Sequence, residues 1–543
     1  MDIYLVCCVE PEKKKPTSKS SQLQTTTITT TTTTTSSDSQ PPYGIILKRA
    51  HTMPNSSILY HNPEDTVFLI DIPASIEIAQ KLSARQISLP SRSARPAIKE
   101  NRANHLLSST PLTTPYELSS EPKTDSSRAK VLERIPHSEQ VYHADIVVPF
   151  VRAGMNTIST TPQPAHVNWC LPRLIEENRS AKGETSRKKR KKPDDGRPRP
   201  GFGFPMTLEG KEYTTTTQSK AVSTPPHHDT SGDPPVILAP GANKFASLSE
   251  VTSLLVRNTS SEPSTIQIPP TAERTPEATD KGHQSTPYSD KSLFHVPPLS
   301  NFVLCQLPLS QDTLVTSTGP IPGLAQERKF NIVLLDPPWH NRSVRRSHHY
   351  KIQSYRRGDI LTQRIREILR LHLYDPPTEC TAGEITSVSP TQRSVAAIWI
   401  TNSTKARATA YNALHGAGLR VREEWIWVKM TVNGEPITPL DGLWRKPYEI
   451  LVIGERAGSP DQKEPVVRRL IAAVPDVHSR KPNLRELFER VFFASSAPMH
   501  GCTDGTELRY SALEVFARNL TAGWWACGDE ALKFNEQGWW VDA

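Results

Sequence analysis

The chain has 543 residues, of which 49 are proline and only 36% are hydrophobic, and its formal net charge is +9. This composition excludes one continuous packed core and predicts a single folded domain beside long disordered segments. The positive charge favours an acidic partner, of which nucleic acid is the commonest, and no apolar run reaches the roughly 18 residues that a membrane span needs.

Two further absences limit the class of protein. The chain begins without the basic segment and apolar run of a secretory signal, and its seven cysteines include no C-x-x-C pair. Neither a disulfide framework nor a zinc site is therefore indicated. We expect a soluble, non-secreted protein in a reducing compartment, with no metal site and no membrane partner.

Composition divides the chain into six segments. Threonine-, serine- and proline-rich stretches cannot bury enough apolar area to offset the entropy lost on ordering. Between them lie two short patches, the first with a strand over 66–72 and an amphipathic helix that opens at Pro73. Each patch is too small to fold alone, so we expect it to dock on the other or on a larger domain. The predicted segments are a disordered Thr/Ser-rich region (1–56), a small ordered strand–helix element (57–92), a linker (93–139), a small ordered patch (140–178), a disordered linker with a basic tract (179–291) and a folded domain (292–543).

Six consecutive cations, Arg187 to Lys192, form the basic tract of the second linker. Such a run is compatible with a solvated charge segment, with a nonspecific nucleic-acid-binding arm or with a nuclear import signal. We favour nuclear import, which predicts the nucleus as the main location and the cytoplasm as a second one.

Strand and helix patterns alternate from residue 292 to the end of the chain, where nine of the ten tryptophans lie. Nearly continuous apolar strands that alternate with helices indicate an α/β fold with a largely parallel sheet buried on both faces. The predicted strands are 331–335, 395–400, 420–428, 448–454 and 512–517, and the predicted helices are 358–372, 404–415 and 482–492, the last with Pro482 at its first position.

The strand predicted at 331–335 runs straight into Asp336-Pro337-Pro338-Trp339. Ligands of open α/β sheets bind beyond the carboxyl ends of the strands, so Asp336 stands where a ligand is expected. The two prolines stiffen the turn and lack N–H groups, which leaves its carbonyl groups to face a ligand. A carboxylate and a fixed carbonyl can accept both hydrogens of a planar exocyclic amine while Trp339 stacks on the attached ring. The tetrapeptide therefore suits the N6 amine of adenine, with an ordinary strand-ending turn as the alternative.

Methylation of that amine requires such a site. The N6 lone pair is delocalised into the purine and is a poor nucleophile. Acceptance of both hydrogens localises the lone pair, and this interaction is stronger in the transition state than in the ground state. The chemistry needs no metal.

The D-P-P-W sequence after an apolar strand resembles the family of S-adenosylmethionine-dependent adenine N6-methyltransferases typified by the catalytic subunit of the mRNA adenosine methyltransferase. The following segment, NRSVRRSHHY, is similar to the methyltransferase-like protein 4 branch of that family. The resemblance covers about 250 C-terminal residues and implies a Rossmann-like methyltransferase fold with a permuted motif order, in which the acceptor motif precedes the cofactor-binding strand. The further similar blocks are 424–454, 475–488, 513–534 and, more weakly, 301–308.

The resemblance also implies roles for individual residues. It implies S-adenosylmethionine as the cofactor and no metal ligands. For Tyr448, a buried position at the start of a core strand is the alternative to a role in substrate binding. One position departs from the family, because Asp529 stands where the family usually has Asn. The residues implied to be catalytic are Asp336, Pro337, Pro338 and Trp339; those implied to bind the cofactor are Lys481, Phe516, Arg518, Asn519, Asp529 and Glu530; and those implied to bind the substrate are Asn341, Arg342, Ser343, Arg345, Arg346, Lys446, Tyr448 and Glu449.

Three functions follow from the resemblance as hypotheses. The first is N6-methylation of adenine in RNA, with 2'-O-methyladenosine of small nuclear RNA as the target of the similar branch. The second keeps the chemistry and changes the substrate to DNA, because the 2'-hydroxyl contact that would distinguish them has no sequence motif. The third is a noncatalytic nucleic-acid-binding partner of the same fold, against which the intact D-P-P-W and Lys481 argue. An obligate protein partner is not indicated.

Overall fold

Two entirely apolar strands form the centre of the fold in the computed structural model. All residues of β11 (Ile332–Leu335) and β12 (Val395–Ile400) are buried, as is usual when helices cover both faces of a sheet. The two strands pair in parallel, with Ile332 opposite Val395. The residues that the structure describes are 55–86, 104–117, 121–160, 169–175, 234–269, 292–308, 319–339, 358–375, 393–443, 445–456, 465–493 and 508–542.

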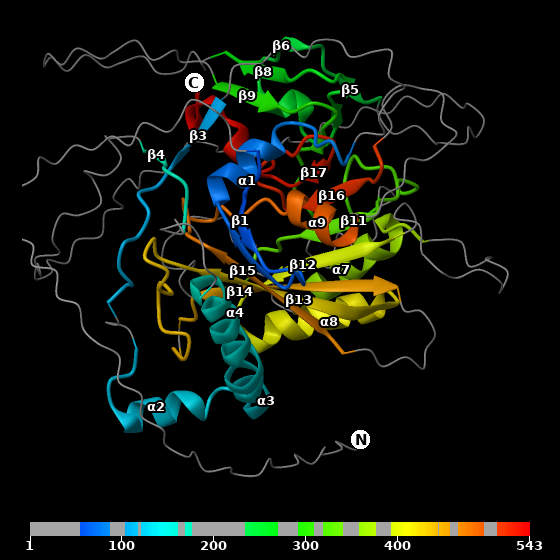
Figure 1. Cartoon of the computed structure of the whole chain (residues 1–543). Coiled ribbons are helices and arrows are strands. Elements are labelled where there is room, and N and C mark those ends of the chain that lie inside the picture. The colour runs from blue at the N-terminus through cyan, green and yellow to red at the C-terminus, as the bar shows by residue number, and fades with distance from the viewer. Residues whose placement is uncertain are drawn as a thin grey trace, which may run out of the picture. The chain divides into compact units, whose positions relative to one another are not determined.

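These strands belong to a 12-stranded sheet that passes through the whole described structure (Figure 1). From β2 to β10 in the spatial order, every strand except β14 runs in the same direction, so the sheet is largely parallel, as predicted. The strands in spatial order are β1 (Ile58–His61), β2 (Val67–Ile70), β15 (Val467–Ala473), β13 (Leu419–Lys429), β14 (Tyr448–Arg456), β12, β11, β16 (Ala512–Val515), β17 (Trp525–Cys527), β10 (Asn301–Val303), β7 (Leu255–Arg257) and β5 (Val236–Ile237).

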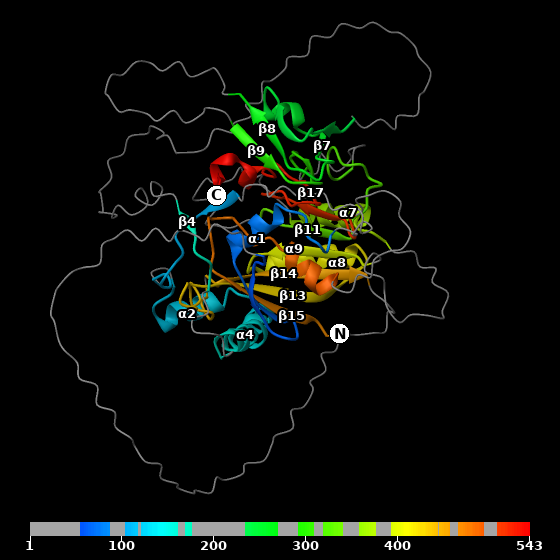
Figure 2. The same ribbon diagram turned by 45° about the horizontal axis from the view of Figure 1, so that its top comes forward.

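Helices cover both faces of this sheet, as the alternation of side chains along β11 shows. Val333 and Leu335 pack in one core cluster with Ile365 of α7, whereas Ile332 packs in the other with Phe488 of α9. In Figures 1 and 2, α7 and α8 accordingly lie together on one side of the sheet and α1 and α9 on the other. The helices are α7 (Gly358–His372), α8 (Thr404–Gly416) and α4 (Val148–Thr160) on the first face, and α1 (Ile72–Ala79) and α9 (Arg485–Phe492) on the second.

The predicted central strands and two of the three predicted helices in this part of the chain are confirmed. The helix predicted at 482–492 instead begins at Arg485, because Pro482 and Asn483 belong to an extended loop and the Asn483 side chain accepts a hydrogen bond from the Arg485 N–H group. Strand β15 was not predicted, since Arg468 and Arg469 interrupt its apolar pattern. These two arginines form ion pairs with Glu424 and Glu423 of the neighbouring β13.

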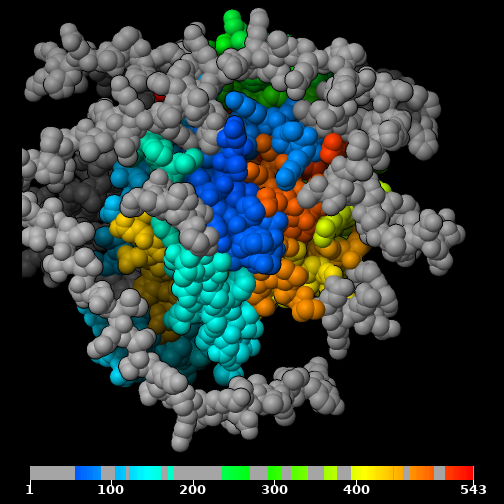
Figure 3. Space-filling view, in the orientation of Figure 1, coloured from blue at the N-terminus to red at the C-terminus, as the bar shows by residue number. Residues whose placement is uncertain are grey.

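The two small N-terminal patches dock on the same sheet. Strand β2 pairs in parallel with β15, which adds β1 and β2 to the edge of the sheet, and α4 approaches β15 closely enough that Gly154 contacts Leu470. In Figure 3 the β1–β2–α1 segment lies between α4 and α9. A short π-helix at Tyr142–Val147 leads into α4. The N-terminal patches are thus structural parts of the C-terminal fold.

Two ranges expected to be linkers contain regular structure in places. Their strands are only two to five residues long, and one of them pairs Asn104 with the distant Asp542, so local patterns carry little information about them. Within 93–139 lie β3 (Asn104–Ser108), α2 (Asp125–Leu132) and the start of α3 (His137–Val141), and within 179–291 lie β5, β6 (Gly241–Lys244), β7 and β8 (Ser264–Ile268). The remaining partners are β4 (Leu174–Ile175), β9 (Ser292–Val296) and β18 (Trp540–Asp542), which form two three-stranded sheets with β3, β6 and β8. The Thr25–Thr35 run and the Arg187–Lys192 tract lie outside the described residues.

The side chain of Asp71 joins the two N-terminal patches, and its removal should destabilise the fold. Its Oδ1 atom caps α1 by accepting from the Ala74 N–H group at 2.8 Å, and its Oδ2 atom accepts from the Leu171 N–H group at 2.9 Å. Asp71→Ala removes a cap and leaves a second N–H group unpaired, so we expect a loss of about 2 kcal/mol in the free energy of unfolding by urea titration.

Thr124→Ala is the matched control, because Thr124 caps the exposed helix α2 without a tertiary contact of this kind. Its loss should be about 1 kcal/mol or less. Equal losses in the two variants would contradict the role assigned to the Asp71–Leu171 hydrogen bond.

Candidate active site

The central strands β11 and β16 create a crevice at their carboxyl ends. They pair in parallel, with Leu335 opposite Val515. The chain continues from β11 through α7 to β12 on one side, and from β16 to β17 on the other side. The two connections leave in opposite directions, and such a point in the sheet is where open α/β sheets bind ligands. Asp336 directly follows β11 at this point.

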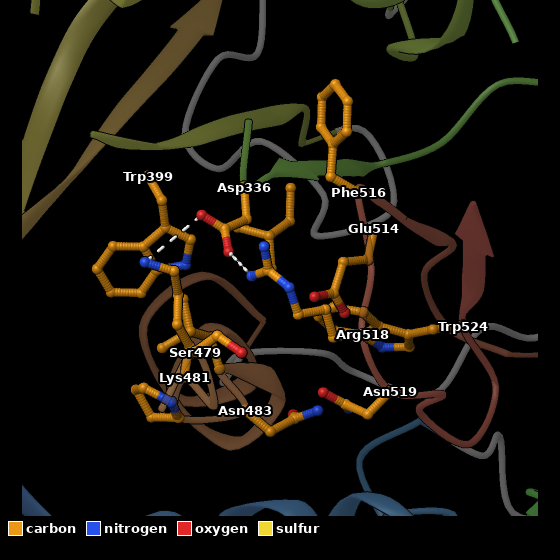
Figure 4. Close-up of a pocket in the computed structure, with 13 residues that line it drawn as sticks. Asp336, Trp399, Ser479, Lys481, Asn483, Glu514, Phe516, Arg518, Asn519 and Trp524 are labelled. Carbon is orange, nitrogen blue, oxygen red and sulfur yellow. Dashed lines mark hydrogen bonds and ion pairs between the residues drawn. The ribbon is translucent and has the colours of Figure 1, made fainter. Parts of the chain in front are cut away.

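A pocket occupies this crevice (Figure 4). It holds about 440 Å³ of empty space, part of which is open to solvent. Its walls come from the ends of β11, β12 and β16, the loop before α9 and the segment after β16. The lining residues are Leu334, Asp336, Trp399, Ser479, Lys481, Pro482, Asn483, Leu484, Glu514, Phe516, Arg518, Asn519 and Trp524.

Two cations hold the Asp336 carboxylate. The guanidinium of Arg518 donates to Oδ2 at 2.6 Å, and the Lys481 ammonium lies 3.5 Å from Oδ1. The side chains of Asp336, Lys481 and Arg518 are only 13%, 19% and 17% exposed, so solvent screens these ion pairs less than it screens surface pairs. The carboxylate is therefore fixed in position on both sides.

Each of these cations has a second carboxylate partner outside the pocket. Lys481 also pairs with Glu449, which in turn pairs with Lys429 at 2.7 Å. Arg518 also pairs with Glu530 at 3.0 Å, and Glu530 in turn pairs with Lys533 at 2.8 Å. A chain of alternating charges thus runs across the carboxyl ends of the strands with Asp336 at its centre. Its members are Lys429, Glu449, Lys481, Asp336, Arg518, Glu530 and Lys533.

The pKa values along this chain follow from these contacts. Burial by itself raises the pKa of Glu449, but Lys481 and Lys429 outweigh it and hold that pKa well below its usual range. Burial likewise lowers the pKa of Lys481, but Asp336 and Glu449 outweigh it and hold that pKa above its usual value. Both groups are consequently charged at neutral pH, which keeps the chain of ion pairs intact.

Glu514, which also lines the pocket, differs in its charge state from the acids of this chain of ion pairs. Burial, with a contribution from the nearby Asp336 carboxylate, raises the pKa of Glu514 to about 8, although Arg518 opposes the shift. Glu514 lies within β16, and Figure 4 shows its carboxyl group close to Arg518 and Trp524. At neutral pH this side chain is mostly the uncharged acid.

The backbone turns sharply where β16 ends. Phe516 has a φ of 61°, a left-handed conformation that is rare for a bulky residue, and such strain is common at functional sites. A Cβ atom on Gly528 would lie 3.2 Å from the Cα atom of Phe516, and Gly528 has a φ of 144°, so glycine is favoured at this position. The turn directs Arg518 and Asn519 back into the pocket.

The D-P-P-W turn differs from the expectation in two details. The Trp339 N–H group donates to the Pro337 carbonyl at 2.8 Å, so that carbonyl already takes part in a tight turn. The indole N–H group of Trp339 donates to the Trp399 carbonyl at 2.7 Å, and the ring packs against the core. The indole thus anchors the turn to β12, and its predicted stacking on a base stays a prediction.

The structure brings together five of the residues singled out in the sequence. Asp336, Lys481, Phe516, Arg518 and Asn519 all line the pocket, although Phe516 also packs against the core. Glu449 and Glu530 lie beside the pocket and reach it through their ion pairs.

Other predicted residues lie elsewhere. Tyr448 is 1% exposed and donates to or accepts from His143 at 2.9 Å, so it occupies the core position that was the alternative. The Lys446 ammonium donates to the Gly442 carbonyl at 3.2 Å and does not line the pocket. Asp529 and Pro338 are exposed and do not line it either. The loop residues Asn341, Arg342, Ser343, Arg345 and Arg346 lie outside the described residues.

Sequence reasoning missed several residues of the site. Trp399, Ser479, Asn483 and Trp524 line the pocket but carry no local pattern that marks them as functional. Glu514 did carry a signal, because an acid within the apolar strand A-L-E-V is unusual in a sheet buried on both faces.

The pocket suits S-adenosylmethionine chemically. The side-chain N–H₂ group of Asn519 is buried and has no hydrogen-bond partner among the described residues, and an unpaired buried donor is a place for a ligand acceptor. Lys481 and Arg518 are cations for a carboxylate, Asp336 and Glu514 are acids for an ammonium group or hydroxyl groups, and Leu334, Leu484 and Trp524 supply apolar surface.

Within the described residues, no group of three or more His, Cys, Asp or Glu side chains could hold a metal ion. No helix in the described part of the chain is long and apolar enough to cross a bilayer.

Comparison with known proteins gives the following relatives. Residues 381–530 match the MT-A70 family. The N6-methyladenosine RNA methyltransferase MTA1 of Cryphonectria parasitica is 40% identical over 227 residues, which cover 40% of this chain and 56% of the relative. A protein of the same name in Pyricularia oryzae is 35% identical over 277 residues, 50% of this chain and 63% of the relative. The N(6)-adenine-specific methyltransferase METTL4 of Mus musculus is 30% identical over 257 residues, 45% of each chain. The chain thus spans less than two thirds of the length of each of these relatives.

The raised pKa of Glu514 predicts a specific pH dependence of stability. A carboxyl group with a pKa of about 8 in the folded chain and 4.5 in the unfolded chain binds more protons when folded, so its contribution to stability is present at acidic pH and is lost as the pH rises towards 8. We expect the free energy of unfolding of the wild type, relative to Glu514→Gln, to fall by about 2 kcal/mol between pH 5 and 8, after allowance for partial exposure.

Urea titrations at several pH values measure this difference. Glu455→Gln is the control and should follow the pH dependence of the wild type, because Glu455 lies on β14 outside the pocket, where it pairs with Arg393 at 2.9 Å. Parallel curves for the wild type and Glu514→Gln would show that Glu514 titrates normally.

Proposed function

We propose that this chain, which belongs to the MT-A70 family, transfers a methyl group from S-adenosylmethionine to the N6 atom of adenine in nucleic acid. The observation that carries the proposal is the position of Asp336, which directly follows β11 and lies in the pocket between Lys481 and Arg518. S-adenosylmethionine bound in the pocket supplies an electrophilic methyl group.

Asp336 activates the acceptor amine in this proposal. An Asp336 oxygen atom accepts one hydrogen of N6 and the Pro337 carbonyl accepts the other, which localises the nitrogen lone pair and increases its nucleophilicity. The methyl group replaces one N6 proton, which leaves to water. In the structure, however, both Asp336 oxygens already have cationic partners. At least one cation therefore has to move when the substrate arrives.

The flanking acids allow that movement. Lys481 keeps Glu449 and Arg518 keeps Glu530 when either cation leaves Asp336, so neither cation is left buried without a partner. The same two cations are available to a carboxylate of the cofactor. The pocket can in this way exchange Asp336 contacts for ligand contacts at small energetic cost.

We propose RNA as the substrate class. The support is indirect: two similar proteins bear names that describe N6-methyladenosine RNA methyltransferases. Resemblance to the methyltransferase-like protein 4 branch further suggests 2'-O-methyladenosine in small nuclear RNA as the target. DNA is the alternative, and a substrate panel distinguishes it.

Asp336→Asn tests the catalytic part of the proposal. Asparagine keeps the shape of the side chain but presents an N–H₂ donor in place of one acceptor, so we expect methyl transfer to fall by at least about 100-fold. The affinity for S-adenosylmethionine should stay within about tenfold of the wild-type value, because Lys481 and Arg518 remain. Methylated nucleosides are measured by mass spectrometry and cofactor binding by calorimetry.

The panel contains one sequence as unmodified RNA, as RNA with a 2'-O-methyladenosine and as single-stranded DNA. Asp375→Asn is the matched control, since the Asp375 side chain is 68% exposed and lies outside the pocket, and it should retain wild-type activity. Normal transfer by Asp336→Asn would refute the catalytic role. Transfer to DNA alone would reassign the substrate class.

We also propose that the Arg187–Lys192 tract directs the protein to the nucleus. Replacement of its six cations by serine in a fluorescent fusion should lower the nuclear-to-cytoplasmic ratio severalfold, because import receptors recognise clustered cations. Replacement of Lys13, Lys14 and Lys15 controls for loss of positive charge and should leave the ratio unchanged. An unchanged ratio in the first variant would remove this role.

A further inference from the structure

Glu514 is an acid in the pocket that the alternating chain of charges does not use. Asp336, Glu449 and Glu530 each have two cationic partners in that chain. Glu514, in contrast, has no ion pair or hydrogen bond from its carboxyl group within the described part of the chain, although it lines the same pocket. It is therefore available to a ligand.

The surroundings of Glu514 explain its charge state. The ionisable groups that face it are Asp336 at the end of β11, Cys527 on β17 and Arg518 in the turn after its own strand, and Lys481 lies farther along the pocket wall. Arg518 forms ion pairs with Asp336 and Glu530, and these two carboxylates weaken the attraction between the Arg518 guanidinium and Glu514. A neutral acid in this position lowers the repulsion with Asp336.

A ligand cation changes this balance. A positive charge placed next to Glu514 would attract its ionised form and replace the missing cationic partner. S-adenosylmethionine carries two positive groups, the α-ammonium and the sulfonium, and its carboxylate has the separate partners Lys481 and Arg518. The charges of the pocket and of this ligand are thus complementary only if Glu514 is ionised in the complex.

We propose that Glu514 is the counter-ion of a positive group of S-adenosylmethionine and releases its proton to solvent when the cofactor binds. The inference rests on the proposed function, since it concerns the same cofactor. The proton balance is simple: Glu514–COOH in the free protein becomes Glu514–COO⁻ in the complex, and one proton passes to the buffer. Glu514 in this way acts as a binding residue that couples cofactor affinity to pH.

Calorimetry measures the released proton directly. Binding of S-adenosylmethionine to the full chain at pH 7 is titrated in two buffers of different ionisation enthalpy, and the difference in heat gives the number of protons released. A group with a pKa of about 8 is roughly nine-tenths protonated at pH 7, so we expect release of up to about 0.9 proton by the wild type. Glu514→Gln should release none from this position and bind the cofactor roughly tenfold more weakly at pH 8.

Two further ligands identify the positive group. S-adenosylhomocysteine keeps the α-ammonium and lacks the sulfonium charge, whereas methylthioadenosine lacks both. Equal proton release with S-adenosylmethionine and S-adenosylhomocysteine assigns the ammonium, and release with S-adenosylmethionine alone assigns the sulfonium. Methylthioadenosine should release no proton, and Glu455→Gln should behave as the wild type with all three ligands.

The outcomes separate this inference from the proposed function. Tight binding of S-adenosylmethionine without proton release, or with equal release by the wild type and Glu514→Gln, would overturn the role of Glu514 and leave the proposed function in place. Failure of the wild type to bind S-adenosylmethionine would overturn both. If Glu514→Gln does not fold, the absence of proton release when the wild type binds S-adenosylmethionine still overturns the role of Glu514.

Discussion

The parallel pairing of β11 with β16 is the constraint on which the site depends. It places Asp336, which ends one strand, beside the turn that follows the other, so that the Arg518 guanidinium reaches the carboxylate at 2.6 Å. The chain leaves the two strands in opposite directions, which is the arrangement at which open α/β sheets bind ligands. Everything that we attribute to the pocket, including its charge pattern and its fit to a cofactor, follows from this pairing.

The charge pattern reconciles two demands on Asp336. A partly buried carboxylate needs cationic partners, yet a group that binds an amine needs unoccupied acceptor sites. The structure meets the first demand with Lys481 and Arg518, and it gives each of them a second acid, Glu449 or Glu530, to which it stays bound when Asp336 changes partner. Glu514 stands apart because no cation of the described chain pairs with it, and burial accordingly favours its neutral form.

The N-terminal half contributes to the framework around the site. Strand β2 extends the central sheet next to β15, and Ser75 of α1 accepts from the backbone of Asn483 in the pocket loop at 3.0 Å. Arg485, at the start of α9, donates to the carbonyls of Ile78 and Lys81. The loop that carries Lys481 is therefore held partly by residues that lie some 400 positions earlier in the chain. Loss of these contacts would act on the pocket without a change in any residue that lines it.

The sequence by itself determined the α/β class, the central strands and the D-P-P-W acid, because hydrophobic periodicity and turn residues are local properties. It also indicated Lys481 and Arg518, but only through resemblance. Only the tertiary structure decided which strands are neighbours, and hence that Glu514 shares a pocket with Asp336, that Tyr448 belongs to the core and that Trp339 anchors its turn. It also decided the docking of β1, β2 and the short strands of the presumed linkers. Pairing between distant segments depends on complementary surfaces that no local pattern encodes, so the folded chain alone could reveal them.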